Sequence, residues 1–111
     1  MFFEIIISNF APMKHPKFII TNRGYLRLDI VYLHRDLLMP HEDCLGGGFY
    51  EYDYVENKLM LSGKSYDYGY PQWSKIELLK VPEAFKGVPI IYRDIHDEEL
   101  NLTDEFTIEY Y

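Results

Sequence analysis

The chain has 111 residues, of which 48% are hydrophobic and 17% aromatic, and this composition predicts one globular domain over residues 1–111. Its 18 acidic and 11 basic residues give a net charge of −7, which disfavours binding to the phosphate backbone of nucleic acids. A single cysteine excludes an intrachain disulfide and fits a reducing compartment. No apolar run approaches the roughly 20 residues that span a bilayer, and the N-terminus lacks the basic region of a signal peptide. We therefore expect a soluble, cytoplasmic protein with no nucleic-acid partner, no membrane partner and no cofactor.

The first third of the chain predicts strands separated by turns. Residues 2–8 form a β-branched run that indicates a strand, and residues 17–21 indicate a second one. The Asn22–Gly24 segment is a turn signal because Asn and Gly accept positive φ. In residues 25–34 the apolar positions alternate as in a strand, although they would also align on one face of a helix. The β-branched and aromatic content favours the strand, and residues 35–44 then read as a polar loop.

A tyrosine-rich hairpin follows. A two-residue turn at Glu56–Asn57 would set Tyr54 opposite Leu59 and Tyr52 opposite Leu61. Because side chains alternate between the faces of a strand, the tyrosines would share the apolar face with the leucines. The residues predicted on that face are Tyr50, Tyr52, Tyr54, Leu59 and Leu61.

The last third mixes helical and strand signals. Ser74 and Glu77 have the spacing of a capping box, which predicts a short helix over about residues 73–80, with a strand as the alternative. Downstream we expect, in order, a helical turn over 82–87, a strand over 88–93, an acidic loop over 94–105 and an edge strand over 106–110. The fold class that results is α+β: a single β-rich domain whose mixed, mostly antiparallel sheet carries one or two short helices.

Two glycine-bearing segments flank the hairpin and carry the candidate ligand-binding residues. Three consecutive glycines can expose N–H donors to an anion, but their spacing matches no phosphate-binding motif and favours a bulge or close packing. The Gly63–Gly69 segment combines a lysine, a serine hydroxyl and flexible backbone, which can hold an oxyanion or form an ordinary polar loop. The candidate ligand-binding residues are Gly46, Gly47, Gly48, Lys64, Ser65, Tyr66 and Asp67.

Histidine and cysteine supply the candidates for catalysis. His15, His34, His41 and His96 are each chemically able to act as a general base near neutral pH. Residues 34–44 hold several potential metal ligands, but their spacing matches no zinc pattern, so we expect no metal site. Cys44 is either a nucleophile or, more in keeping with its place before a strand, a small buried apolar residue.

The paired motifs Cys44-Leu-Gly-Gly-Gly48 and Gly63-x-Ser-x-x-Tyr-Gly69 resemble the Janus/Ocnus family, which includes the small phosphohistidine phosphatase. The resemblance covers about residues 44–92. It implies a compact α+β fold with one mixed sheet and two helices. It also implies that backbone N–H groups around the matched serine bind phosphate, and that a histidine on a helix preceding Cys44 is the catalytic base.

Carried onto this chain, the resemblance places Ser65, Tyr66 and Asp67 in the phosphate-binding stretch, with Asp67 where the family has a small residue. The family's base would fall near residues 23–25, where this chain has no histidine, and His34 is the nearest candidate. We therefore expect a non-catalytic protein of this fold that binds a phosphorylated or anionic small ligand or a protein partner. The alternative is a phosphohistidine (phosphoramidate) phosphatase with His34 as base and the 63–69 loop as the phosphate cradle.

Overall fold

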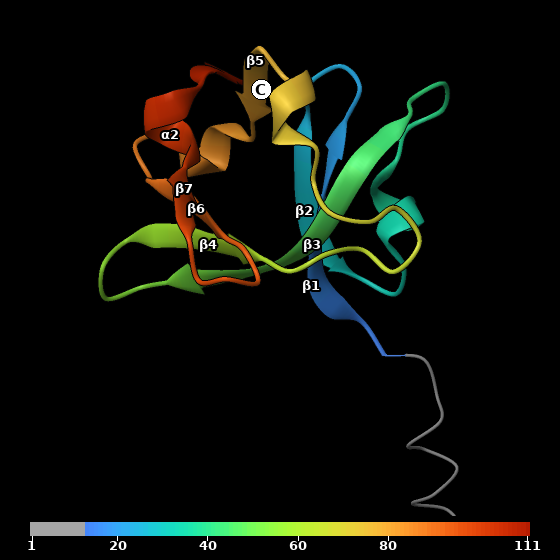
Figure 1. Cartoon of the computed structure of the whole chain (residues 1–111), viewed down its shortest axis with the longest axis horizontal. Helices are drawn as coiled ribbons and strands as arrows, with labels where there is room; N and C mark the ends of the chain where they lie inside the picture. The colour runs from blue at the N-terminus through green and yellow to red at the C-terminus, as the bar shows by residue number, and fades with distance from the viewer. Residues whose placement is uncertain (1–12) are drawn as a thin grey trace, which may run out of the picture.

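The computed structural model describes residues 13–111, and most of these residues lie in strands or in the turns between them (Figure 1). The strand expected over residues 2–8 lies outside the described residues. The elements in chain order are β1 (His15–Thr21), β2 (Leu26–Val31), η1 (His34–Leu37), β3 (Cys44–Asp53), β4 (Lys58–Ser62), η2 (Trp73–Lys75), β5 (Leu78–Val81), η3 (Glu83–Phe85), β6 (Ile90–Arg93), β7 (Glu99–Asn101), α2 (Leu102–Glu105) and β8 (Thr107–Tyr110).

The strands form two sheets. The larger has the order β2-β1-β3-β4-β6-β7, and all its neighbours are antiparallel except β4 and β6. The smaller is the parallel pair β5 and β8. An isolated bridge between Tyr25 and Lys80 joins the start of β2 to β5. The mixed, mostly antiparallel sheet is thus confirmed, whereas the family resemblance implied one sheet and the described residues form two.

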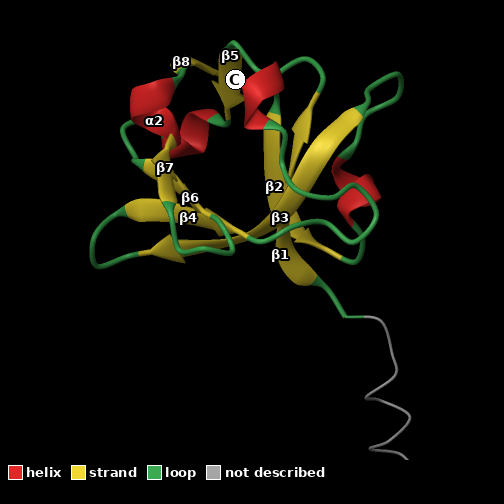
Figure 2. Cartoon of the chain, viewed as in Figure 1, coloured by secondary structure: helices red, strands yellow, loops and turns green. Residues whose placement is uncertain are grey.

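The helical elements are single turns of three or four residues (Figure 2). Among residues 13–111, no helix has the length and apolar character needed to cross a bilayer. The strand-rich, α+β-like domain is held by one apolar cluster to which both sheets contribute. Its buried members are Phe18, Ile20, Leu26, Leu59, Leu61, Ile76, Leu79, Val81, Val88, Ile90, Tyr92 and Leu102.

The early strands agree with the sequence patterns. β1 covers the predicted strand at 17–21, and β2 confirms the strand interpretation of residues 25–34. The two strands pair antiparallel across the predicted turn, where Gly24 has φ +85°. Of residues 35–44, expected as loop, the first three belong to η1, which begins at His34.

The hairpin of β3 and β4 has a different register from the prediction. A four-residue turn over 54–57 pairs Tyr52 with Leu59 and Tyr50 with Leu61. The shift is by two residues, so it preserves the face, and Tyr50 and Tyr52 pack against the core as expected. Tyr54 lies in the turn instead and is 86% exposed, so its predicted place on the apolar face is wrong.

The helix predicted over residues 73–80 is wrong beyond its first turn. η2 ends at Lys75, and β5 follows with Leu79 and Val81 buried at strand period. The N-cap residue of η2 is Gln72, and no side chain forms a capping hydrogen bond there, so the Ser74–Glu77 capping box does not form. Pairing with β8 supplies the backbone hydrogen bonds that a two-turn helix would otherwise provide, and Leu79 and Val81 are buried in the apolar core.

The C-terminal segment is more ordered than the predicted loop over 94–105. β7 pairs with β6, and α2 begins where the Asn101 side chain accepts a hydrogen bond from the Asp104 N–H. The helical turn expected over 82–87 forms as η3, and Gly87, with φ +81°, lies two residues after its end. The strands expected over 88–93 and 106–110 form as β6 and β8.

Candidate functional site

A cavity of about 450 Å³ lies where the two ends of the hairpin motif approach β1 and η1. His34 stands at the start of η1, and the loop after β4 forms the opposite wall. The residues that line the cavity are Lys17, Leu33, His34, Phe49, Lys64, Tyr66 and Asp67. The structure therefore brings His34 together with three of the predicted ligand-binding residues, Lys64, Tyr66 and Asp67.

The His34 ring is held in one orientation by its surroundings. Its Nε2 lies 2.8 Å from the Gly48 carbonyl oxygen. A carbonyl only accepts hydrogen bonds, so Nε2 carries the proton and Nδ1 carries the lone pair in the neutral ring. The Phe49 ring packs against the imidazole at 73°, with 5.6 Å between ring centres. Among residues 13–111, Trp73 Nε1 is the only fully buried side-chain nitrogen or oxygen without a hydrogen-bond partner. His34 Nδ1 is therefore not a fully buried, unpartnered atom.

The surroundings of His34 also keep it neutral. Burial lowers the pKa of the imidazole, and the charge of Lys17 adds to this effect. The hydrogen bond to Gly48 and the charge of Asp67 act in the opposite direction but do not cancel it. His34 is therefore unprotonated at neutral pH and has a nitrogen lone pair available as a base.

The 63–69 loop is a tight turn whose serine faces inward. Gly63 and Gly69 have φ of +75° and +78°, which other residues rarely adopt. The Ser65 N–H donates to the Gly69 carbonyl at 3.1 Å, and its hydroxyl accepts from the Tyr68 N–H at 3.1 Å. Ser65 is buried and does not line the cavity. Its polar groups shape the loop, so they are not available to a ligand.

The tip of the loop offers free donors. Among residues 13–111, the N–H groups of Tyr66 and Asp67 have no hydrogen-bond acceptor. Tyr66 is 97% exposed, so its N–H lies at the protein surface. Tyr66 and Asp67 both line the cavity, so their N–H groups are candidate donors to an anion there.

Two lysines give the cavity positive charge. The Lys17 ammonium donates to the Tyr32 carbonyl, and the Lys64 ammonium lies over the Tyr70 ring, 5.4 Å from its centre. Neither lysine forms an ion pair with another residue in the part of the chain that the structure describes. With His34 neutral, the formal charges of Lys17, Lys64 and Asp67 give the lining one net positive charge.

The three glycines lie in β3, and none of them lines the cavity. Gly46, with φ +107°, lies at a bulge where two residues of β3 oppose one of β1. A Cβ at Gly47 would lie 2.2 Å from the Phe18 oxygen and 3.2 Å from the His34 ring, and one at Gly48 would lie 2.2 Å from the Ser62 oxygen. The glycines thus permit close packing, and Gly48 reaches the cavity only through its carbonyl contact with His34.

The other candidates lie elsewhere. His41 is exposed, has φ +67° and does not line the cavity, and His15 and His96 are exposed as well. Burial raises the pKa of the Cys44 thiol, whose Sγ donates to the Gly46 carbonyl, so a thiolate nucleophile is disfavoured. Within residues 13–111, no three His, Cys, Asp or Glu side chains gather in a group suited to a metal ion.

Sequence reasoning missed Lys17, Leu33 and Phe49 as lining residues. Lys17 and Phe49 are directly opposite each other in the β1–β3 pairing, so their side chains share a face. The alternation of β1 and β3 would identify them once those strands were known to be neighbours. No local motif marks them.

Comparison with known proteins identifies neither a family nor a function. A scan against protein-family models finds no match. Searches of curated proteins and of solved structures find no significant similarity either.

Proposed function

We propose that the protein is a phosphohistidine-phosphatase-like hydrolase that acts on a phosphoramidate group in the His34 cavity. The proposal is supported mainly by one observation: the His34 ring, with Nε2 fixed on the Gly48 carbonyl, lines the same cavity as the Lys64–Asp67 loop. The choice of a phosphorus–nitrogen bond follows from the resemblance of the two glycine-bearing motifs to the Janus/Ocnus family.

In this mechanism the phosphoryl oxygens bind to the lysines and to the free N–H groups of Tyr66 and Asp67. His34 Nδ1 accepts a proton from water as the water oxygen bonds to phosphorus. The P–N bond breaks, and the departing nitrogen takes the proton from the His34 imidazolium. The products are inorganic phosphate and the free imidazole or amine, and His34 returns to its neutral form.

The test is phosphate release from a phosphohistidine peptide and from phosphoramidate by the purified protein. His34→Gln retains an amide donor for the Gly48 carbonyl but has no basic nitrogen, and we expect it to lower turnover by about 10²–10⁴-fold. His41→Gln, at an exposed position outside the cavity, is the matched control and should retain full activity. Equal turnover by the wild-type protein and His34→Gln would refute the proposal.

The second candidate is non-catalytic binding of an anionic ligand or partner in the same cavity. It is favoured by Asp67, whose carboxylate repels a doubly charged phosphate and stands where the resembling family has a small residue. Under this alternative, Asp67→Asn strengthens phosphate binding by roughly threefold to tenfold, as measured by calorimetry, and neither protein hydrolyses phosphoramidate. Turnover that depends on His34 would exclude it.

A further inference from the structure

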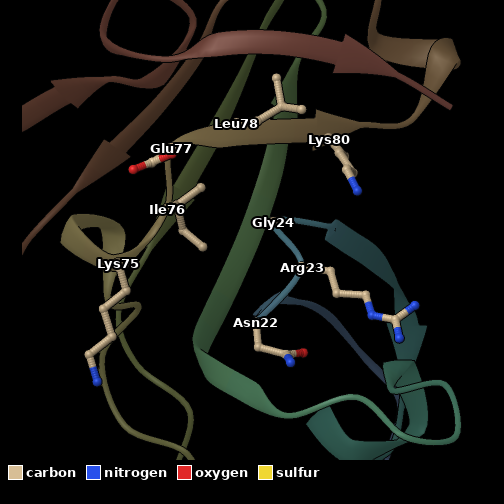
Figure 3. A pocket seen from close by; sticks show the side chains of 8 residues that line it. All are labelled: Asn22, Arg23, Gly24, Lys75, Ile76, Glu77, Leu78 and Lys80. Atoms are coloured by element: carbon tan, nitrogen blue, oxygen red, sulfur yellow. The ribbon is translucent and has the colours of Figure 1, made fainter.

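A second cavity, of about 330 Å³, lies at the seam between the two sheets (Figure 3). One wall is the turn that joins β1 to β2, and the other is the segment that leads into β5. The lining residues are Asn22, Arg23, Gly24, Lys75, Ile76, Glu77, Leu78 and Lys80. It shares no lining residue with the His34 cavity.

Unpaired positive charge concentrates in these two cavities. Four of the 11 basic residues form ion pairs within the described part of the chain. Of the remaining seven, two line the His34 cavity and three line the seam cavity, namely Arg23, Lys75 and Lys80. In a chain with 18 acidic residues, three cations around one hollow without an ion-pair partner indicate a place for an external anion.

The orientation of the charged groups supports such a site. In Figure 3 the Lys80 ammonium and the Arg23 guanidinium extend on the same side of the cavity, whereas the Glu77 carboxylate and the Lys75 ammonium extend on the opposite side. Arg23 also helps to lower the pKa of Glu42, but the carboxylate of Glu42 is already bound by Arg27. Arg23 therefore keeps donors for a ligand.

The floor of the cavity is rigid. The Lys80 N–H donates to the Gly24 carbonyl at 2.8 Å, next to the bridge between Tyr25 and Lys80. Gly24 has φ +85°, and a Cβ there would lie 2.2 Å from the Leu78 oxygen, so the turn and β5 are in close contact. The Lys80 ammonium lies over the Tyr25 ring, 4.5 Å from its centre, which restricts its position. Preformed cations lose less conformational entropy when they bind a ligand.

We propose that this seam cavity is a second anion-binding site, which takes a diphosphate group through Arg23 on the turn and Lys80 on β5. Two adjacent phosphates offer enough oxygens to reach cations on both walls, and a guanidinium binds a phosphate through two parallel hydrogen bonds. The site is independent of the hydrolysis proposed for the His34 cavity.

Titration of the ¹⁵N-labelled full chain with inorganic pyrophosphate, followed by amide chemical shifts, tests this site. We expect saturable shifts at residues 22–24 and 75–80. Arg23→Gln and Lys80→Gln should each weaken binding about tenfold. Glu77→Gln removes the single acidic lining residue and should tighten binding. A parallel titration with adenosine diphosphate distinguishes recognition of a free diphosphate from recognition of a nucleotide: equal affinity indicates the former, and tighter binding indicates the latter.

The controls separate this site from the His34 cavity and from general charge effects. Lys64→Gln should leave the seam shifts unchanged, as should Lys86→Gln, which alters an exposed lysine outside both cavities. Shifts confined to residues 64–67, or shifts that Lys86→Gln reduces as much as Lys80→Gln does, would overturn the proposal. The amide spectrum of each variant also reports whether it is folded.

Discussion

His34 combines burial with access to a cavity, and both properties come from its neighbours. The side chains of Leu33 and Phe49 line the cavity beside it, and Gly48 fixes its ring through a backbone oxygen. Only 5% of the residue is exposed, so its protonated form is poorly hydrated. A histidine in such a place is more easily kept neutral than one on the surface, and this suits a general base.

The lowered pKa of His34 predicts a specific pH dependence. Because the ordinary histidine pKa is about 6.5, the acid limb of kcat/KM for phosphoramidate hydrolysis should lie below that pH, with a plateau above it. The stability contribution has the same sign: it is present above the unfolded pKa and is lost as pH falls through the folded pKa. Proton NMR titration of the ring measures the pKa directly. A His34 pKa above 6.5 in the free protein would contradict this prediction.

At the level of elements, the 63–69 loop is attached to the sheet through Tyr92. The Tyr92 hydroxyl, on β6, donates to the Gly63 carbonyl at 2.6 Å. Burial, the largest cause, raises the pKa of Tyr92 to about 12, so the hydroxyl keeps its proton at physiological pH. β6 is adjacent to β4, the strand that leads into the loop, so one hydrogen bond links the loop to the next strand of the sheet.

Tyr92→Phe should loosen this loop without disturbing the core. Leaving the Gly63 carbonyl without its partner costs about 1–3 kcal/mol, to be measured by urea denaturation. Faster hydrogen exchange at Ser65 and Gly69 should accompany the loss, because these residues close the loop with mutual backbone hydrogen bonds. Tyr54→Phe, which removes an exposed hydroxyl in the hairpin turn, is the control and should have little effect on either quantity. Unchanged exchange in Tyr92→Phe would show that the loop is held by other contacts.

The elements also show which features local sequence patterns can predict. Strand periodicity placed Tyr50 and Tyr52 on the core face even though the turn length was wrong, because a two-residue register shift preserves the face. At β5 the capping-box spacing favoured a helix, with a strand as the alternative, and the strand is what forms, paired with β8 far along the chain. A capping-box spacing is a local signal, and here the pairing of distant strands overrides it.

The candidate site likewise contains residues that local sequence patterns identify and residues that they do not. His34, Lys64, Tyr66 and Asp67 were identified from residue chemistry and motif spacing, and they line one cavity. Ser65 was expected to face a ligand, but it satisfies its hydrogen bonds inside the loop. Lys17 and Phe49 enter the site through strand pairing, which local spacing does not reveal.

At the scale of the whole molecule, the two sheets share one core. Leu79 and Val81 of β5 belong to the same apolar cluster as Phe18 of β1 and Ile90 of β6. The β5–β8 pair is therefore packed against the larger sheet, and its stability depends on that contact. Two-stranded sheets are marginal when isolated.

Leu79→Ala should consequently destabilise the entire domain. Truncating a fully buried leucine costs about 2–5 kcal/mol, and both sheets should still unfold in one transition because they share the cluster. Urea denaturation followed by far-UV circular dichroism and by the fluorescence of Trp73, the single tryptophan, measures both properties. Val55→Ala, at a residue that is 94% exposed, should stay within about 0.5 kcal/mol of the wild type. Separate transitions for the two probes would mean that the sheets unfold independently.

The contact between His34 and Gly48 limits how this site can evolve by amino-acid substitution. The acceptor that selects the imidazole tautomer is a main-chain oxygen in β3, so no exchange of side chain can delete it. A substitution at position 48 would place a Cβ against the Ser62 oxygen and would endanger the strand itself. The imidazole tautomer of His34 is thus fixed by the backbone of the sheet. Mutation can change the charges around the base more readily than it can change which nitrogen is basic.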